Sequence, residues 1–144
     1  KNAVGCVFCN LPAANHDEES LIVLRGVKNF VILNRYPYTS GHVMIVPYAH
    51  TADFAALDAA TTAEMMQLAQ QVQTALAGTY HPDGFNLGMN LGRAAGAGIA
   101  DHLHLHLLPR WTGDTNFMTT VGETRMQPEE LSVTYAKLRE ALHA

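Results

Sequence analysis

Polar and apolar residues alternate without a break from His102 to Leu107, which reads His-Leu-His-Leu-His-Leu. Successive side chains of a β-strand point to opposite faces of a sheet. The alternation therefore predicts a strand with three histidines on one face and three leucines on the other. A helix is excluded, because neither residue type recurs at three- and four-residue spacing. We expect the leucine face to join the hydrophobic core.

Four other segments have strand character, because they are rich in β-branched and aromatic residues and are bounded by turn residues. These segments are 21–24, 30–33, 42–46 and 85–91. A turn that contains Gly26 joins the first two and predicts a hairpin. The short connections favour antiparallel pairing among the first three strands.

Two longer stretches have helical periodicity. The first follows Thr61-x-x-Glu64, which has the spacing of a capping box, and Gly78 offers a stop after it. The second follows Pro128, which suits the first turn of a helix. Apolar residues recur at near-helical spacing in both stretches. They are Met65, Leu68, Val72 and Leu76 in the first, and Leu131, Tyr135, Leu138 and Leu142 in the second.

Shorter segments complete the expected architecture. Residues 53–57 predict a short helical turn, and residues 15–19 predict a surface loop. Strands and helices that segregate in this way predict an α+β fold, with a mainly antiparallel sheet of about five strands and two main helices. The chain of 144 residues fits one domain, 1–144, in which residues 111–144 form an extension after the histidine strand.

Composition narrows the possible partners. Hydrophobic residues make up 48% of the chain and charged residues 15%, as in globular domains. The net charge of -4 gives no basic stripe for nucleic acid, although a small phosphate-bearing ligand remains compatible. No apolar run approaches the length of a membrane span, and no signal peptide opens the sequence. We therefore expect no nucleic-acid partner, no membrane association and a cytoplasmic location.

The histidine row permits two kinds of chemistry. His102, His104 and His106 are candidate metal ligands. A neutral imidazole also attacks phosphorus as a nucleophile, while its neighbours donate hydrogen bonds to the phosphate oxygens. A purely structural row is the third alternative, and it is disfavoured because buried imidazoles without partners are costly. The small-residue loop 92–100 fits a phosphate cradle of backbone amides, or else a flexible turn.

The two cysteines lie close together, as Cys6-Val-Phe-Cys9. In a sequence without a secretion signal, this spacing indicates a metal half-site or a redox pair rather than a structural disulfide. The alternative is a pair of small buried residues near an N-terminal turn.

The run His102-Leu-His104-Leu-His106-Leu-Leu resembles the signature of the histidine triad (HIT) superfamily. The resemblance covers roughly residues 6–130 and implies the HIT fold. Further segments that match the family are 33–35, 41–43, 90–92 and 96–99. Within the superfamily, residues 109–111 and 113–118 look most like the bacterial diadenosine tetraphosphate phosphorylase branch.

The resemblance implies roles for individual residues in nucleotidyl transfer or hydrolysis at an α-phosphate. His104 takes the position of the nucleophile, and His106 a position that orients it or holds the phosphate, with His102 as a second candidate for that role. Asn34 matches the ribose contact. Phosphate contacts match Asn90, Gly96, Ala97, Gly98 and Ile99. Trp111 and the loop 113–118 are expected to close over an incoming phosphate.

One position departs from the family pattern. Many relatives carry Gln-Ser or Gln-Thr shortly before the triad, and the hydroxyl helps to protonate the leaving group. Gly98 and Ile99 occupy these places here, and Ile99 has no proton to transfer. A nucleoside polyphosphate is already a stable anion when it leaves, so the departure favours dinucleotide polyphosphates over phosphoramidates as substrates.

Some relatives hold zinc with a Cys-x-x-Cys pair, a later histidine and the first triad histidine. The matching residues here are Cys6, Cys9, His50 and His102. Two thiolates and two imidazoles make the closed tetrahedral set of a structural zinc site. With zinc bound, His102 is a ligand. Without zinc, His50 and His102 would be hydrogen-bonded supports behind the nucleophile.

The activity that the resemblance implies is phosphorolysis of diadenosine tetraphosphate to ADP and ATP, with an adenine dinucleotide and inorganic phosphate as partners. Hydrolysis to AMP and ATP is the alternative within the same fold. A nucleotide-binding or sensor protein with little turnover is a second alternative, although a pure binder needs no nucleophile. A plain zinc hydrolase ranks last, because only Asp101 supplies a carboxylate beside the row. The family usually forms homodimers.

Overall fold

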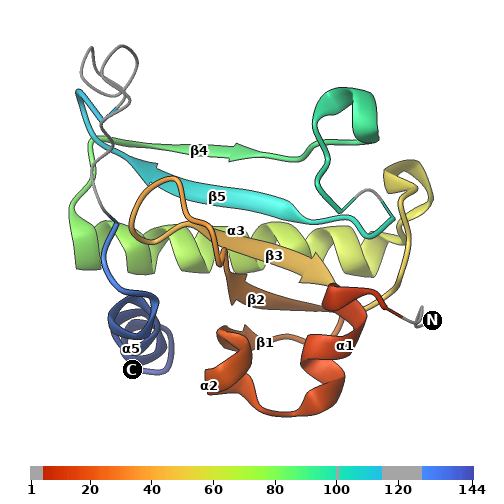
Figure 1. Ribbon diagram of the computed structural model, residues 1–144, viewed down its shortest axis with the longest axis horizontal. Helices are drawn as coiled ribbons and strands as arrows, with labels where there is room; N and C mark the ends of the chain where they lie inside the picture. Colours follow the sequence, from red (N-terminus) through yellow and green to blue (C-terminus); the bar gives the residue numbers. More distant parts are fainter. Residues whose placement is uncertain (1–4, 100, 115–127) are drawn as a thin grey trace.

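The computed structural model describes residues 5–99, 101–114 and 128–144. Its centre is one five-stranded sheet with the order β1-β2-β3-β5-β4, in which neighbouring strands run antiparallel (Figure 1). The strands are β1 Ile22–Arg25, β2 Asn29–Leu33, β3 Val43–Pro47, β4 Gly84–Gly88 and β5 Leu105–Arg110. Each overlaps a segment that the sequence predicts, and the α+β class with an antiparallel five-stranded sheet is confirmed.

Two main helices complete the core. Helix α3, Ala59–Tyr80, packs on the sheet and shares the hydrophobic core with Leu105 and Leu107 of β5 (Figure 1). Helix α5, Leu131–Leu142, packs against α3 and β1. The predicted faces of the two helices are largely confirmed. Buried residues on them are Met65, Leu68, Val72, Leu76, Tyr135, Leu138 and Leu142, joined by Ala69, whereas Leu131 is only partly buried. No helix in the described ranges has both the length and the hydropathy for a membrane crossing.

The ends of α3 differ from the prediction. Asp58 is the N-cap, and its side chain accepts a hydrogen bond from the Thr61 amide at 2.7 Å. Glu64 is drawn away from a capping box, because its carboxylate accepts the exposed amides of the β1–β2 turn, Val27 at 2.6 Å and Lys28 at 2.8 Å. The helix also runs through Gly78 and ends at Tyr80.

Two N-terminal helices lack a clear signal in the sequence. Helix α1, Val7–Ala14, is only 8 residues long, contains Pro12 and has no side-chain cap. Helix α2, Asp17–Ser20, lies where a surface loop was predicted. Isolated helices this short are marginal in water, so packing must hold them. Phe8 and Cys9, both buried, supply that packing for α1. The 3-10 helix η1, Phe54–Ala56, confirms the turn predicted at 53–57.

The position of β5 places the histidines. Strand β5 lies between β3 and β4, and His106 pairs with Met44 on β3. The ladder begins at Leu105, so His102 and His104 precede the regular strand and are buried between it and neighbouring segments. The amide of Leu103 donates to the carbonyl of Thr51 at 2.9 Å, which ties this stretch to the segment after β3.

Candidate active site and metal site

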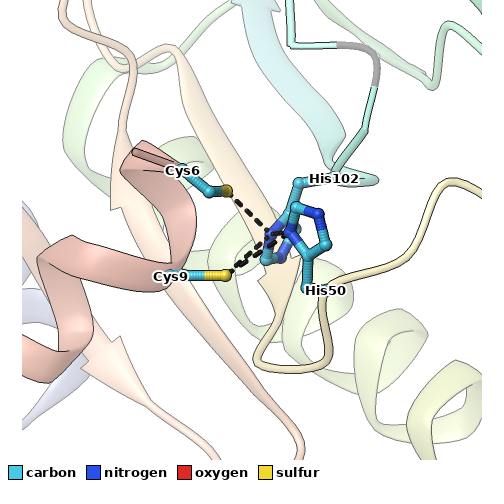
Figure 2. Close-up of side chains that lie close together, drawn as sticks. All are labelled: Cys6, Cys9, His50 and His102. Atoms are coloured by element: carbon cyan, nitrogen blue, oxygen red, sulfur yellow. Dashed lines mark hydrogen bonds between the residues drawn. The ribbon is translucent and has the colours of Figure 1, made fainter. Parts of the chain in front are cut away.

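The histidine row divides into two environments. The ring of His102 is fully buried and faces Cys6, Cys9 and His50 (Figure 2). The rings of His104 and His106 line a cavity on the other side. Phe8 separates the two environments, because its ring contacts His102 at a centroid distance of 5.5 Å and His104 at 5.0 Å.

The cysteines reach His102 from the first turn of α1. Cys6 is the residue before the helix and Cys9 follows three positions later, so both side chains leave the same side of the turn. The Sγ atoms of Cys6 and Cys9 lie 3.3 and 3.6 Å from His102 Nδ1. His50 follows the end of β3, and its Nδ1 lies 3.5 Å from Cys9 Sγ and 3.3 Å from His102 Nδ1.

The tautomer of His102 suits metal binding. A carbonyl oxygen only accepts hydrogen bonds, and the carbonyl of Pro47 lies 2.8 Å from His102 Nε2. Nε2 therefore carries the proton, and Nδ1 presents its lone pair to the two thiols and His50. Such a carbonyl partner is a common support for a metal-bound histidine. Burial lowers the pKa of His102 and raises that of Cys6.

The spacing of the four donor atoms fits zinc. Zinc bound tetrahedrally at about 2.0–2.3 Å from nitrogen and sulfur keeps its ligand atoms roughly 3.3–3.8 Å apart. Four of the six separations among the sulfur and nitrogen atoms run from 3.3 to 3.6 Å, and all four atoms lie within 4.8 Å of one another. A set of two thiols and two imidazoles leaves no ligand position open for catalysis, so the arrangement suits a structural metal.

The ring of His104 presents a lone pair to the cavity. Its Nδ1 lies 2.9 Å from the backbone carbonyl of His102, which again only accepts. Nδ1 therefore carries the proton in the neutral ring, and Nε2 keeps the lone pair. Within the described residues, no hydrogen-bond partner is recorded for Nε2. His104 is thus arranged as a nucleophile or as an acceptor.

The ring of His106 presents a proton instead. The amide of Tyr38 donates to Nδ1 of His42 at 3.2 Å, so the neutral His42 ring carries its proton on Nε2. That proton is donated to Nδ1 of His106 at 2.9 Å. Nε2 of His106 then carries a proton. His42 belongs to the family-matching segment 41–43, and the structure places it in direct contact with His106 of the triad.

Burial keeps this second pair of rings neutral. It lowers the pKa of His42 from 6.5 to about 4, with a smaller contribution from the neighbouring His106. It also lowers the pKa of His106, with His104 as the second cause. At neutral pH the chain of donors from Tyr38 to His106 therefore consists of an amide and two uncharged imidazoles.

The cavity has a volume of about 660 Å³, within the usual range for small-molecule sites. Its lining includes apolar residues of α1 and β2, among them Val7, Leu11 and Ile32. Among the described residues of the lining, Arg35 alone carries a formal charge. No carboxylate lines the cavity within the described residues, although the chain as a whole has a net charge of -4. The site is therefore suited to an anion.

Most of the predicted phosphate and ribose contacts reach the cavity. Asn34, Asn90, Gly96, Gly98 and Ile99 line it, whereas Ala97 is not part of the lining. The amide oxygen of Asn34 accepts from the Tyr36 amide at 2.8 Å, so its NH₂ group faces inward, 3.4 Å from His42 Nε2. Two donors meet at that last contact, and it is not a hydrogen bond.

Trp111 lies away from the cavity. Its ring meets that of Tyr80 edge-on at a centroid distance of 6.4 Å, and its amide donates to Asp114 at 3.1 Å. Residues 115–118 of the loop that was expected to close over phosphate lie outside the described residues. Phe8 and Arg35 were not named as site residues from the sequence, although Phe8 lies inside the Cys-x-x-Cys pair and Arg35 lies inside the family-matching segment 33–35.

The chain is similar in sequence to known proteins. An AP-4-A phosphorylase from Mycobacterium tuberculosis (strain ATCC 25618 / H37Rv) is 41% identical over 124 residues, which cover 86% of this chain. The matched region spans only 63% of the length of that relative. An adenosine 5'-monophosphoramidase from Schizosaccharomyces pombe is 25% identical over 128 residues, covering 89% of this chain and 91% of that one.

The fold match is closer to full length. A zinc-bound histidine triad family protein from Mycobacterium smegmatis superposes with a TM-score of 0.80 at 29% identity, covering 99% of this chain and 96% of that one. The HIT domain family matches residues 15–113, which include the whole histidine row. The chain therefore belongs to the HIT domain family.

Proposed function

We propose that this protein is a nucleotide-processing enzyme that cleaves dinucleoside polyphosphates at the α-phosphate, and that phosphorolysis of diadenosine tetraphosphate to ADP and ATP is its reaction. The observation that carries the proposal is the lone pair of His104 Nε2, directed into a cavity whose described lining contains no carboxylate. A relative that is named a phosphorylase supports the choice of substrate and reaction. Inorganic phosphate is the expected second substrate.

In the first step, Nε2 of His104 attacks the α-phosphorus. The new N–P bond replaces the bridging P–O bond, whose electron pair leaves with ATP. The proton on Nδ1 of His104 stays hydrogen-bonded to the His102 carbonyl, which stabilises the positive charge that develops on the ring. In the second step, an oxygen of inorganic phosphate attacks the same phosphorus, which forms ADP and regenerates His104.

His106 is the hydrogen-bond donor in this scheme. Its Nε2 proton, fixed by the pair with His42, is directed at a phosphate oxygen, where negative charge accumulates during transfer. The amides of Gly96, Ala97, Gly98 and Ile99, with Asn90, are proposed to hold the phosphates, and Asn34 the ribose. A role for Trp111 requires a change in its packing against Tyr80.

Cys6, Cys9, His50 and His102 would hold a structural zinc ion. When bound, the metal supplies a rigid cross-link rather than an acid or a hydroxide. The chain's own contribution is to fix α1, with Phe8, and the main chain of His102 beside the nucleophile. His102 then has no direct contact with the substrate, so His104 and His106 remain for phosphate.

The remaining expectations stay proposals. We propose that residues 1–144 form one domain with 111–144 as an extension, and that two copies form a homodimer in the cytoplasm. Strand β4 lies at the edge of the sheet, with Leu87 52% exposed, which supports pairing with a second copy.

The decisive experiment combines product analysis with intact-mass spectrometry. Diadenosine tetraphosphate is supplied with and without inorganic phosphate, and the protein is examined for an adenylyl adduct that maps to His104. ADP and ATP formed only with phosphate support phosphorolysis. Phosphate-independent formation of AMP and ATP would replace it with hydrolysis, which the monophosphoramidase relative keeps as the second candidate. Binding without turnover would identify a sensor.

A further inference from the structure

The side chains of three residues at the rim of the cavity take no part in the proposed reaction steps. Arg35, Tyr36 and Tyr38 all line the cavity and lie on the loop between β2 and β3. Tyr36 is 84% exposed and Tyr38 is 68% exposed. Two exposed aromatic rings beside a cation, at the mouth of a site for anions, are typical of a binding surface rather than of a hydrophobic core.

Ring contacts place this rim relative to the nucleophile. Starting from α1, the ring centroids of Phe8 and His104 lie 5.0 Å apart, and those of His104 and His106 also lie 5.0 Å apart. The centroids of His106 and His42 lie 5.1 Å apart. The Tyr38 ring stacks over His42 with a centroid distance of 6.1 Å and an angle of 25° between the ring planes. The cavity therefore has an apolar end at Phe8 and an aromatic, cationic end at the β2–β3 loop, with the nucleophile between them.

We propose that Tyr36 and Tyr38 form a stacking platform for the second nucleoside of a dinucleoside polyphosphate, the one that departs with the leaving group, while Arg35 binds its phosphate chain. This inference rests on the proposed function and adds a second binding subsite to it. The nucleoside attached to the attacked phosphorus takes the apolar end, beside Val7 and Leu11. The leaving half lies on the opposite side of the phosphorus from His104 Nε2, beyond His106.

Hydrogen bonds of the β2–β3 loop fix the position of the two tyrosines relative to the histidine triad. The Tyr36 amide donates to Asn34 at 2.8 Å, and the Tyr38 amide donates to His42 at 3.2 Å. The Thr39 hydroxyl donates to the carbonyl of Pro109 on β5 at 2.8 Å. Because these bonds fix the main chain on both sides of the rings, the tyrosines offer pre-ordered faces to a base.

The test compares two substrates that differ only in the second nucleoside. Adenosine 5'-tetraphosphate has the same phosphate chain as diadenosine tetraphosphate but ends without a base. Stacking on an aromatic side chain contributes about 1–3 kcal/mol per base, which corresponds to roughly 5- to 150-fold in kcat/KM. We expect Tyr36→Ala and Tyr38→Ala together to lower kcat/KM for the dinucleotide by roughly tenfold or more. The value for adenosine tetraphosphate should stay within about twofold.

Two controls sharpen the result. Phe54→Ala removes another exposed aromatic side chain, 46% exposed and outside the cavity lining, and should change neither substrate. Tyr36→Phe with Tyr38→Phe keeps both ring faces and should restore the preference for the dinucleotide. If the double alanine variant loses kcat/KM equally on both substrates, or on neither, the proposed stacking platform is wrong.

A binding measurement separates this inference from the proposed reaction. In a His104→Gly background, calorimetry with the two ligands reports the same difference without turnover. A loss of affinity confined to the dinucleotide in the tyrosine double variant supports the platform even if the wild-type protein cleaves neither compound. Unchanged affinity for both ligands overturns it, whatever the catalytic result.

Discussion

Two pairs of histidines flank His104. One pair presents a nitrogen lone pair to a metal site, and the other presents an N–H group to the cavity. His50 and His102 face the thiols, where the Pro47 carbonyl accepts a hydrogen bond from Nε2 of His102 and so leaves the Nδ1 lone pair for a metal. His42 and His106 face the cavity, where the Tyr38 amide donates to His42, His42 donates to His106, and the Nε2 proton of His106 points to the cavity. The backbone carbonyl beside His102 makes that ring a potential metal ligand. The backbone amide beside His42 makes the second ring of its pair, His106, a hydrogen-bond donor.

The largest effect is expected at the residue between the pairs. His104→Gly removes the proposed nucleophile, and kcat should fall by roughly 10³-fold or more, while nucleotide binding remains measurable. Steady-state kinetics and calorimetry on the same preparation check this. Near-normal turnover in the variant would contradict covalent catalysis through His104.

The metal-facing pair should control stability. His50→Asn or chelation should lower the free energy of unfolding by several kcal/mol, because metal binding contributes directly to folding in such sites. Thermal unfolding and elemental analysis on protein purified without chelator provide the measurement. The matched control is His16→Asn, an exposed histidine whose nearest charged partner is Glu19 at 3.9 Å. Purified protein that contains no zinc, and whose thermal unfolding is unchanged by chelators, would contradict the proposed metal site.

The cavity-facing pair should control rate with little effect on metal content. His42→Phe removes the donor to His106 Nδ1, which frees that ring to adopt the other tautomer. We expect kcat to fall roughly 10- to 100-fold, with zinc content unchanged. His42→Asn, which keeps a short donor, should recover part of the loss. A change in KM alone would argue for a packing role instead.

Stability should also depend on pH through His42. The pKa of this ring is about 4 in the folded protein against 6.5 for an ordinary histidine, because burial disfavours the charged form. Between these values the unfolded chain binds a proton that the folded chain does not, so the free energy of unfolding falls as pH drops, by at most about 3 kcal/mol. Urea titrations from neutral to acidic pH test this. His42→Phe should flatten that part of the curve.

The smallest effect is expected at Ile99. Restoring a hydroxyl with Ile99→Ser should change turnover of diadenosine tetraphosphate by less than about threefold, because ATP leaves as a stable anion. The same change should raise the cleavage of an adenosine phosphoramidate, whose amine needs a proton. Parallel kinetics on the two substrates decide, and a large gain on the dinucleotide would show that its leaving group does need an acid.

Periodicity in the sequence was enough to predict the parts of the molecule that depend on local pattern. The α3 and α5 faces, the hairpin and the part of the histidine strand from Leu105 onward follow from alternating or helical spacing. His102 and His104 lie before the regular strand, so the prediction of three histidines on one strand face was only partly right. Helix α1 was missed because its 8 residues include Pro12 and no cap, and its order comes from Phe8 and Cys9 packing against distant segments. The cap at Asp58 was missed because Glu64 is recruited by the β1–β2 turn, a contact that no local pattern reveals.

The candidate site shows the same division. The resemblance to the family predicted that Cys6, Cys9, His50 and His102 form one metal site. In the structure their donor atoms lie within 4.8 Å of one another. The assignment of protons to individual ring nitrogens depends on the Pro47 carbonyl and the Tyr38 amide, which are main-chain atoms. Main-chain partners carry no residue-type signature, so only three-dimensional geometry identifies them.

A third main-chain atom, the carbonyl oxygen of His102, bears on how such proteins change during evolution. The group that sets the proton position on His104 is the peptide carbonyl of residue 102, which every amino acid possesses. A lineage is therefore free to exchange the side chains at positions 6, 9, 50 and 102 for an ordinary apolar cluster while inheriting the nucleophile intact. The proposed metal site and the proposed nucleophile, although they meet at residue 102, are therefore separable traits.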